Sequence, residues 1–477
     1  MSSVAINAFT AARERLAAQV IDPPEARPAY EVFGPPPAPV PALGALPSTG
    51  AIAGAARALD AGVTTSVALT ELALQRIAKD DWTAFVHVDA QAALAEARAR
   101  DAELRAGRRR GPLHGVPVSV KDVIHVGGMP TRCGSDAFHQ RPEADAAAVD
   151  LWRAAGAVIL GKTSTHEFAL GVTSPQARNP HDPTRIPGGS SGGSAIAVAT
   201  GMGFASLGTD TRASIRVPAA LCGVVGLKPT YETVPTRGVV PLSWTMDHVA
   251  VMAAGVEDAA LALDALRPDA PAIAPAVGAR VSHLRVGLAT AAWEGAEAVV
   301  EAAVARQVDK LDGLVAAVRE TDRPTAADFG GANAMGLLVS RCEAATFHRA
   351  AGLDRSLYWA EVRDQLDAAD GVPATDYIDA QRYRSALREE MLAVFREHHV
   401  LAMPTAPVLA PPVERADEYL TILSRNAILW SFVGFPAISL PCPTDGLPVG
   451  LQLVAGPGGE ALLIALAAAL TEKAGGA

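Results

Sequence analysis

Serine, lysine and glycine, three residue types that can support acyl transfer, are concentrated between positions 115 and 230 of this 477-residue chain. A glycine-rich stretch, Gly188-Gly189-Ser190-Ser191-Gly192-Gly193-Ser194, is followed by Gly208-Thr209-Asp210-Thr211-Arg212-Ala213-Ser214-Ile215-Arg216. Glycine lets the backbone approach a neighbouring group closely. The two stretches therefore predict a site where backbone lies against a phosphate, a helix or a substrate carbonyl.

A phosphate-binding loop is the first interpretation to test. Residues 156–163 match the pattern of glycine, four residues, glycine, lysine and threonine. That loop must follow a strand and turn its amides towards the anion. Here the four intervening residues, 157–160, are apolar and themselves predict a strand, so the match does not indicate a phosphate site.

The nucleophile elbow of α/β-hydrolases is the second interpretation. The segment 189–193 fits its glycine-x-serine-x-glycine pattern and would make Ser191 the nucleophile. An elbow follows a buried strand, but Pro187 interrupts any strand at this point. No histidine downstream has a distinguishing sequence context, so this alternative lacks an evident base.

Lysine is the third candidate base. A serine hydroxyl attacks only when a base removes its proton, and a lysine can do so when burial keeps it neutral. Lys121 follows Val118-Ser119-Val120, a predicted buried strand, so we expect its pKa to lie below the ordinary value of about 10.4. The alternative is a simple ion pair between Lys121 and Asp122.

Composition narrows the class of protein. Hydrophobic residues make up 49% and charged residues 19% of the chain, which is typical of a globular protein with a large core. A net charge of −10 disfavours nucleic acid or an anionic membrane as the main partner. The four cysteines are widely spaced and predict neither a disulfide framework nor a zinc site. With no leader-like or membrane-spanning pattern, we expect a cytoplasmic protein.

The order of predicted elements indicates an α/β fold. Residues 1–48 predict a short helix followed by a proline-rich arm, which could lie on the body or reach the other protomer of a homodimer. Strand-like and helical segments alternate through a core at 110–255, and mostly helical sequence covers about 256–400. Strand-like segments return at 437–440 and 448–454, within a C-terminal part at 400–477. We therefore expect one large domain, 49–477, with a sheet covered by helices on both faces.

A long ordered set of motifs resembles the amidase signature family. The resemblance rests on the segments 115–122, 187–194, 208–219 and 223–230, and extends to 161–168, Asp247, 404–405 and 446–452. It covers roughly 49–477 and is weakest between about 270 and 400. The resemblance implies a large, mixed, twisted sheet and hydrolysis of an amide without a cofactor.

The resemblance also implies roles for particular residues. Ser214 resembles the nucleophile, Ser190 the bridging serine and Lys121 the base of a Ser-Ser-Lys triad. A cis peptide between Gly189 and Ser190 is implied, and Ser191 is expected to be a structural hydroxyl. The backbone amides of Thr211, Arg212, Ala213 and Ser214 would form the oxyanion hole.

One position departs from the family pattern. Members usually carry small residues before the nucleophile, whereas this chain has Arg212-Ala213. If Arg212 points into the pocket, it could hold a carboxylate or a second carbonyl of the substrate. If it points outward, it is surface charge. Arg216 is expected to be a buried scaffold residue paired with Asp210.

The resemblance and these residues together imply a hydrolase of a C–N bond in a small amide, aryl amide, carbamate (urethane) or urea-type substrate, with esterase or urethanase activity as a further expectation. Trp244, Trp430 and Phe432 are candidates to line an apolar substrate pocket or to be ordinary core. Two alternatives stay open. One is the amidase component of a glutamine-dependent transamidase, which needs partner subunits and tRNA; the other is a binding protein that has lost turnover.

Overall fold

One mixed sheet of 11 strands organises the protein in a computed structural model that describes residues 51–472. The strand order is β1-β3-β2-β4-β6-β5-β10-β11-β9-β7-β8. The strands are β1 (Phe85–Val88), β2 (Pro117–Lys121), β3 (Val158–Thr163), β4 (Ala205–Asp210), β5 (Val225–Lys228), β6 (His248–Ala253), β7 (Arg285–Ala289), β8 (Ala317–Thr321), β9 (Val400–Pro404), β10 (Ala437–Cys442) and β11 (Val449–Ala455).

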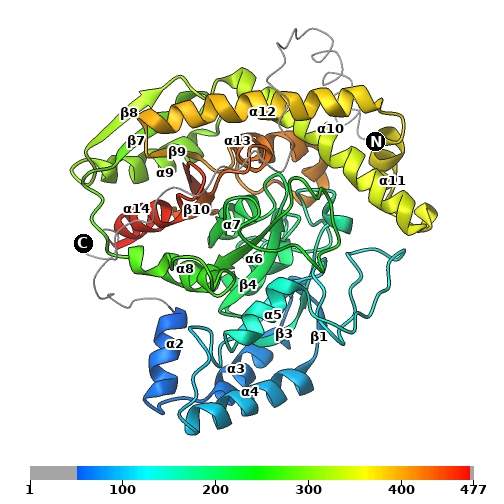
Figure 1. Ribbon diagram of the computed structural model, residues 1–477, viewed down its shortest axis with the longest axis vertical. Helices are drawn as coiled ribbons and strands as arrows, with labels where there is room; N and C mark the ends of the chain where they lie inside the picture. Colours follow the sequence, from blue (N-terminus) through cyan, green and yellow to red (C-terminus); the bar gives the residue numbers. More distant parts are fainter. Residues whose placement is uncertain (1–50, 473–477) are drawn as a thin grey trace.

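Helices pack around this sheet, and together they confirm the expected α/β class (Figure 1). They are α2 (Ala51–Asp60), α3 (Ser66–Ile77), α4 (Ala90–Arg105), α5 (Ala147–Ala154), α6 (Gly192–Ala199), α7 (Arg216–Cys222), α8 (Val256–Asp264), α9 (Ala298–Val308), α10 (Ala326–Ala351), α11 (Ala360–Ala369), α12 (Ala374–Glu397), α13 (Leu420–Phe432) and α14 (Glu460–Glu472). The blue helices α2 to α4 lie at one end of the molecule, and the yellow α10 to α12 lie at the other.

The strands expected from apolar runs are confirmed as β2, β3, β10 and β11. The region 256–400 is less uniformly helical than expected, because it contributes β7 and β8, which pair in parallel with each other, while β7 also pairs in parallel with β9. β8 is an edge strand with partly exposed residues, so it lacks the apolar run by which a buried strand is recognised. The predicted arm at 1–48 lies outside the described residues.

Parallel pairing of β2 with β3 and β4 decides where the candidate site lies. β2 runs parallel to both β3 and β4, and every residue of these three strands is buried. The carboxyl ends of parallel neighbours meet at the same edge, where ligands bind in open α/β sheets. Lys121 ends β2 and Asp210 ends β4, so sheet register alone brings their segments together. Within residues 51–472, no helix is long and apolar enough to cross a bilayer.

Candidate active site

Lys121 is held at the end of β2 by two hydroxyl groups. Its Nζ donates one hydrogen bond to Ser190 Oγ and another to Thr209 Oγ1, both at 2.7 Å. The side chain is fully buried. Thr209 lies near the end of β4, the parallel neighbour of β2, whereas Ser190 comes from the loop that leads into α6. Two separate segments therefore aim hydroxyls at one amine.

Burial lowers the pKa of Lys121 to about 7, although Asp247 and Asp210 act in the opposite direction. The expected lowering is thus confirmed, and a substantial fraction of this amine is neutral near neutral pH. The alternative ion pair with Asp122 is wrong, because Asp122 Oδ1 lies 3.0 Å from Nζ of a different buried lysine, Lys162. Lys162 belongs to β3, where the phosphate-loop pattern is indeed a strand.

The loop carrying Ser190 lies too close to its neighbours to accommodate larger residues. The peptide between Gly189 and Ser190 is cis, as the resemblance implied. A Cβ on Gly189 would lie 2.7 Å from Ser174 Oγ. The Ser190 carbonyl accepts hydrogen bonds from the His166 amide and from Ser174 Oγ, each at 3.2 Å. The glycines of this stretch therefore serve close approach, as expected.

Ser191 joins the two serine loops by structural hydrogen bonds. Its amide donates to the Ser214 carbonyl at 3.3 Å, and its Oγ donates to the Thr209 carbonyl at 3.2 Å. The Ser191 hydroxyl is thus engaged in a hydrogen bond with a backbone group. These bonds fit the structural role expected for Ser191 rather than that of an elbow nucleophile.

Four consecutive backbone amides, those of residues 211–214, are the most unusual feature of the Ser214 loop. Ser214 is only 3% exposed and its three predecessors are also buried, yet none of these amides donates to an acceptor within residues 51–472. Buried backbone amides are almost always paired. A cluster of free ones is able to receive a developing oxyanion. The described side chains make no hydrogen bond between Ser190 Oγ and Ser214 Oγ, so the structure joins Lys121 to Ser190 but not Ser190 to Ser214.

A buried ion pair fixes the Ser214 loop from behind. Arg216 makes two hydrogen bonds of 3.0 Å to the carboxylate of Asp210, as expected from the sequence, and Asp210 also accepts from Ser431 Oγ and the Ile215 amide. Burial alone would raise the pKa of Asp210, but the Arg216 guanidinium holds it well below its usual range. The pair is fully buried, so it constrains both ends of the loop.

Arg216→Met should lower the free energy of unfolding by about 3 to 5 kcal/mol, because it leaves the Asp210 carboxylate buried without its partner. Denaturant unfolding followed by circular dichroism measures this. Arg415→Met is the matched control: its pair with Glu418 is exposed, so little or no change is expected. Equal effects of the two changes would contradict the anchoring role.

Asp247 supports the same loop from the other side. Its Oδ1 accepts from Thr211 Oγ1 at 2.6 Å, and its Oδ2 accepts from the amides of Leu242 and Ser243, each at 3.0 Å. Burial raises the pKa of Asp247 to about 7, against these hydrogen bonds. Protonation of Asp247 and Lys121 is therefore expected to be coupled.

Arg212 is buried rather than outward-facing, so the surface-charge interpretation is wrong. Only 8% of the residue is exposed. Its Nη2 donates to Asn333 Oδ1 of α10 at 2.7 Å and to Ser424 Oγ of α13 at 3.4 Å. The side chain thus reaches from the Ser214 loop to α10 and α13.

The aromatic candidates for a substrate pocket differ in their exposure. Trp430 and Phe432 are fully buried in a hydrophobic cluster with Phe329, so they are core residues. Trp244 is 48% exposed, and its carbonyl accepts from the Tyr231 hydroxyl. The structure therefore supplies no reason to place either tryptophan against a substrate.

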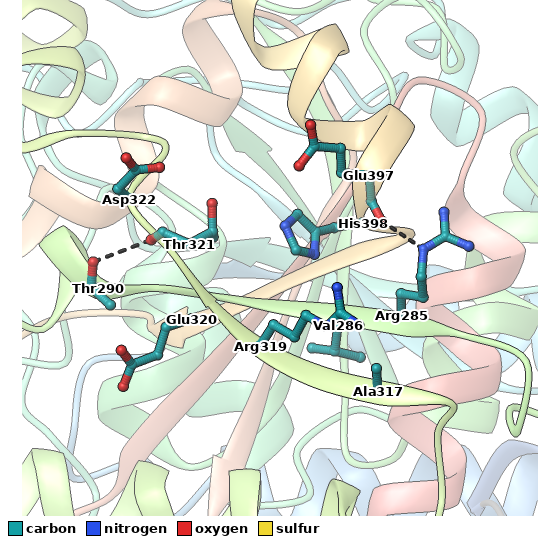
Figure 2. Close-up of a pocket in the computed structure, with 10 residues that line it drawn as sticks. All are labelled: Arg285, Val286, Thr290, Ala317, Arg319, Glu320, Thr321, Asp322, Glu397 and His398. Carbon is teal, nitrogen blue, oxygen red and sulfur yellow. Dashed lines mark hydrogen bonds between the residues drawn. The ribbon is translucent and has the colours of Figure 1, made fainter.

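A cavity of about 490 Å³ lies apart from the serine loops, beside β7 and β8 (Figure 2). Basic and acidic side chains line it, including Arg285, Arg319, Glu320 and His398, and Arg285 Nε donates to the Glu397 carbonyl at 2.6 Å. None of its lining residues belongs to the predicted site. Among residues 51–472 no cluster of three histidine, cysteine or acidic side chains could hold a metal ion.

Sequence reasoning missed several residues that contact the site. Thr209 lies inside a quoted motif, so its position beside Lys121 could have been inferred from parallel strands. Asn333 and Ser424 carry no local signal, because they reach Arg212 only through tertiary packing of α10 and α13.

Comparison with known proteins gives the family. The family model described as Amidase matches residues 68–464. A glutamyl-tRNA(Gln) amidotransferase subunit of Chloroflexus aurantiacus is 36% identical, over 87% of this chain and 94% of that protein. An amidase of Pseudomonas putida is also 36% identical, over 76% of this chain and 83% of that protein. A crystal structure of an amidase superposes with a TM-score of 0.81 and 37% sequence identity. The superposition covers 88% of this chain and 99% of that amidase. The match over most of the chain, together with a fold shared with solved amidases, establishes that this protein belongs to the amidase signature family.

Proposed function

We propose that the protein hydrolyses the C–N bond of a small amide or amide-like substrate through an acyl-enzyme on Ser214. The observation that carries the proposal is the buried contact between Lys121 Nζ and Ser190 Oγ, with a lysine pKa of about 7. An amine of that pKa can accept a proton at neutral pH, which is the property a serine nucleophile requires of its base.

The proposed reaction begins with the transfer of two protons along the path from Ser214 through Ser190 to Lys121. Neutral Lys121 takes the Ser190 hydroxyl proton while Ser190 takes that of Ser214, whose Oγ attacks the carbonyl carbon. Catalytic hydrogen bonds often tighten only with substrate bound, so we expect the Ser214 to Ser190 bond to form at that stage. The four free amides of residues 211–214 would then bind the tetrahedral oxyanion.

Breakdown of the intermediate reverses the proton path. The C–N bond breaks as Ser190 gives its proton to the leaving nitrogen and regains one from Lys121. Water then attacks the Ser214 ester by the same route, which releases the acid and restores the free serine. No step needs a metal ion or an organic cofactor.

The test is a panel of amides, aryl amides, carbamates, ureas and esters, assayed with the purified chain alone. We expect hydrolysis of at least one class and labelling of Ser214 by a fluorophosphonate probe, identified by peptide mass spectrometry. If no substrate reacts and Ser214 stays unlabelled, the binding-protein alternative is favoured instead.

A transamidase component is the second candidate, and the 36% identity to an amidotransferase subunit favours it specifically. In that case the chain alone should hydrolyse glutamine poorly, and activity should depend on partner subunits and tRNA. Turnover of simple amides by the isolated chain, without stimulation by such partners, would argue for the independent hydrolase.

A further inference from the structure

Two buried arginines near the nucleophile loop lack an acidic partner. Arg212 is 8% exposed, and its polar partners within residues 51–472 are the neutral groups Asn333 Oδ1, 2.7 Å away, and Ser424 Oγ, 3.4 Å away. Its Nε is buried without any partner. A guanidinium remains charged in proteins, and burying its charge without a carboxylate costs free energy.

Arg341 is the second of these arginines. It is 6% exposed, and within the described residues it makes neither a hydrogen bond nor an ion pair. It follows Asn333, the anchor of Arg212, by two turns on α10. In a helix the Cα–Cβ bonds tilt towards the N-terminus, which is the direction of that anchor. Burial, reinforced by the charge of Arg341, lowers the pKa of Arg212 to about 9, which indicates that the two cations are near each other.

The surrounding acidic groups do not neutralise both charges. Burial lowers the pKa of Arg341 to about 10, even though Glu361 of α11 acts to raise it. Glu361 Oε1 lies 2.9 Å from His166 Nε2, and the His166 amide donates to the Ser190 carbonyl. Among the described residues, the Glu361 carboxylate therefore acts on Arg341 while bonded to His166, and no carboxylate acts on Arg212. This group of residues connects the Ser190 loop with the Ser214 loop.

We propose that Arg212 and Arg341 form a cationic subsite that binds a carboxylate of the substrate, within reach of the bond cleaved at Ser214. This inference rests on the proposed amide hydrolysis and names its substrate class, an amide that also carries a carboxylate. A carboxylate supplies the missing negative charge and accepts two parallel guanidinium hydrogen bonds. A neutral second carbonyl would leave the excess positive charge buried.

The experiment compares matched chromogenic substrates. Succinyl, glutaryl and adipoyl p-nitroanilides carry a terminal carboxylate where butyryl, pentanoyl and hexanoyl p-nitroanilides carry a methyl group. A charge-assisted hydrogen bond contributes enough for the best carboxylate substrate to exceed its neutral partner by about 10- to 100-fold in kcat/KM. A second pair, 4-acetamidobenzoate and acetanilide, covers a carboxylate on the leaving group, and a preference in either pair supports the proposal.

Arg341→Met tests the subsite without touching the nucleophile loop. We expect it to reduce the preference for the carboxylate substrate over its neutral partner by about tenfold or more. Arg341→Lys should retain part of the preference. Arg349→Met is the control on the same helix: Arg349 is exposed and pairs with Asp370, so this variant should keep the full preference.

Binding of glutarate, measured by titration calorimetry, gives a readout that does not depend on turnover. We expect Arg341→Met to raise its Kd by about tenfold or more, with circular dichroism confirming an intact fold. Equal turnover of charged and neutral substrates, with glutarate affinity unaffected by the change, would overturn the subsite and leave the proposed function standing. Conversely, glutarate binding that depends on Arg341 in a chain that hydrolyses nothing would support the subsite and count against the proposed function.

Discussion

Ser214→Ala should reduce kcat/KM for any amide that the protein hydrolyses by about 10⁴-fold or more, the scale seen when the nucleophile of a serine hydrolase is removed. The change deletes the atom that is proposed to form the acyl-enzyme. It leaves the four backbone amides of residues 211–214 in place. Substrate binding should therefore persist while the chemical step is lost, which single-turnover kinetics and a calorimetric Kd can separate.

Ser191→Ala is the matched control for this prediction. Ser191 is the nucleophile in the alternative elbow interpretation, but its hydroxyl is bonded to the Thr209 carbonyl. We expect a modest loss of stability, of about 1 kcal/mol, and kcat/KM within about tenfold of the original. The reverse result, an inactive Ser191→Ala beside an active Ser214→Ala, would move the nucleophile to the elbow.

Lys121→Met should lower kcat by about 10³-fold or more, because the variant has no group able to accept the Ser190 proton. Methionine preserves the length and volume of the buried chain. Lys121→Arg should be equally inactive: arginine keeps the positive charge but does not deprotonate. If the arginine variant restored activity, the charge of this residue rather than its basicity would be what matters.

The pH dependence checks the same residue in the unmodified protein. Burial lowers the pKa of Lys121 to about 7, so the active neutral amine predominates above that pH and disappears below it. We expect log kcat/KM to rise with pH through about 7 and then level. The Lys121→Met variant should lose this rise. Because burial also raises the pKa of Asp247 to about 7, Asp247→Asn is needed to show which group sets the midpoint.

The contacts around the candidate catalytic residues are more predictable from sequence than those around the residues proposed to set specificity. Lys121, Ser190 and Ser214 lie in motifs with strong local constraints, such as a buried strand end and glycines in tight contact. The predicted pairing of Arg216 with Asp210 is likewise confirmed. These contacts form between residues that are close in sequence or that lie on adjacent parallel strands. A sequence motif or the register of a predicted sheet can therefore indicate them.

Residues brought together by helix packing are not predictable in the same way. Arg212 stands out in the sequence as a departure, but whether it faces solvent depends on Asn333 and Ser424, which lie in distant parts of the chain. Arg341 lies in a region of weak motifs, where nothing in the periodicity separates it from an ordinary surface arginine. For Trp430 the sequence left pocket lining and ordinary core open, and its complete burial favours the core.

The position of Arg212 has a consequence for how this protein could change over time. The groups proposed to break the bond come from residues 121–214, at the ends of β2 and β4 and in the loops beside them, whereas the anchors of Arg212 come from α10 and α13. Substitutions on those two helices can reshape what the pocket accepts without disturbing the proton path. Selectivity and reactivity therefore depend on separate parts of the chain, and the Arg212 side chain connects these two parts.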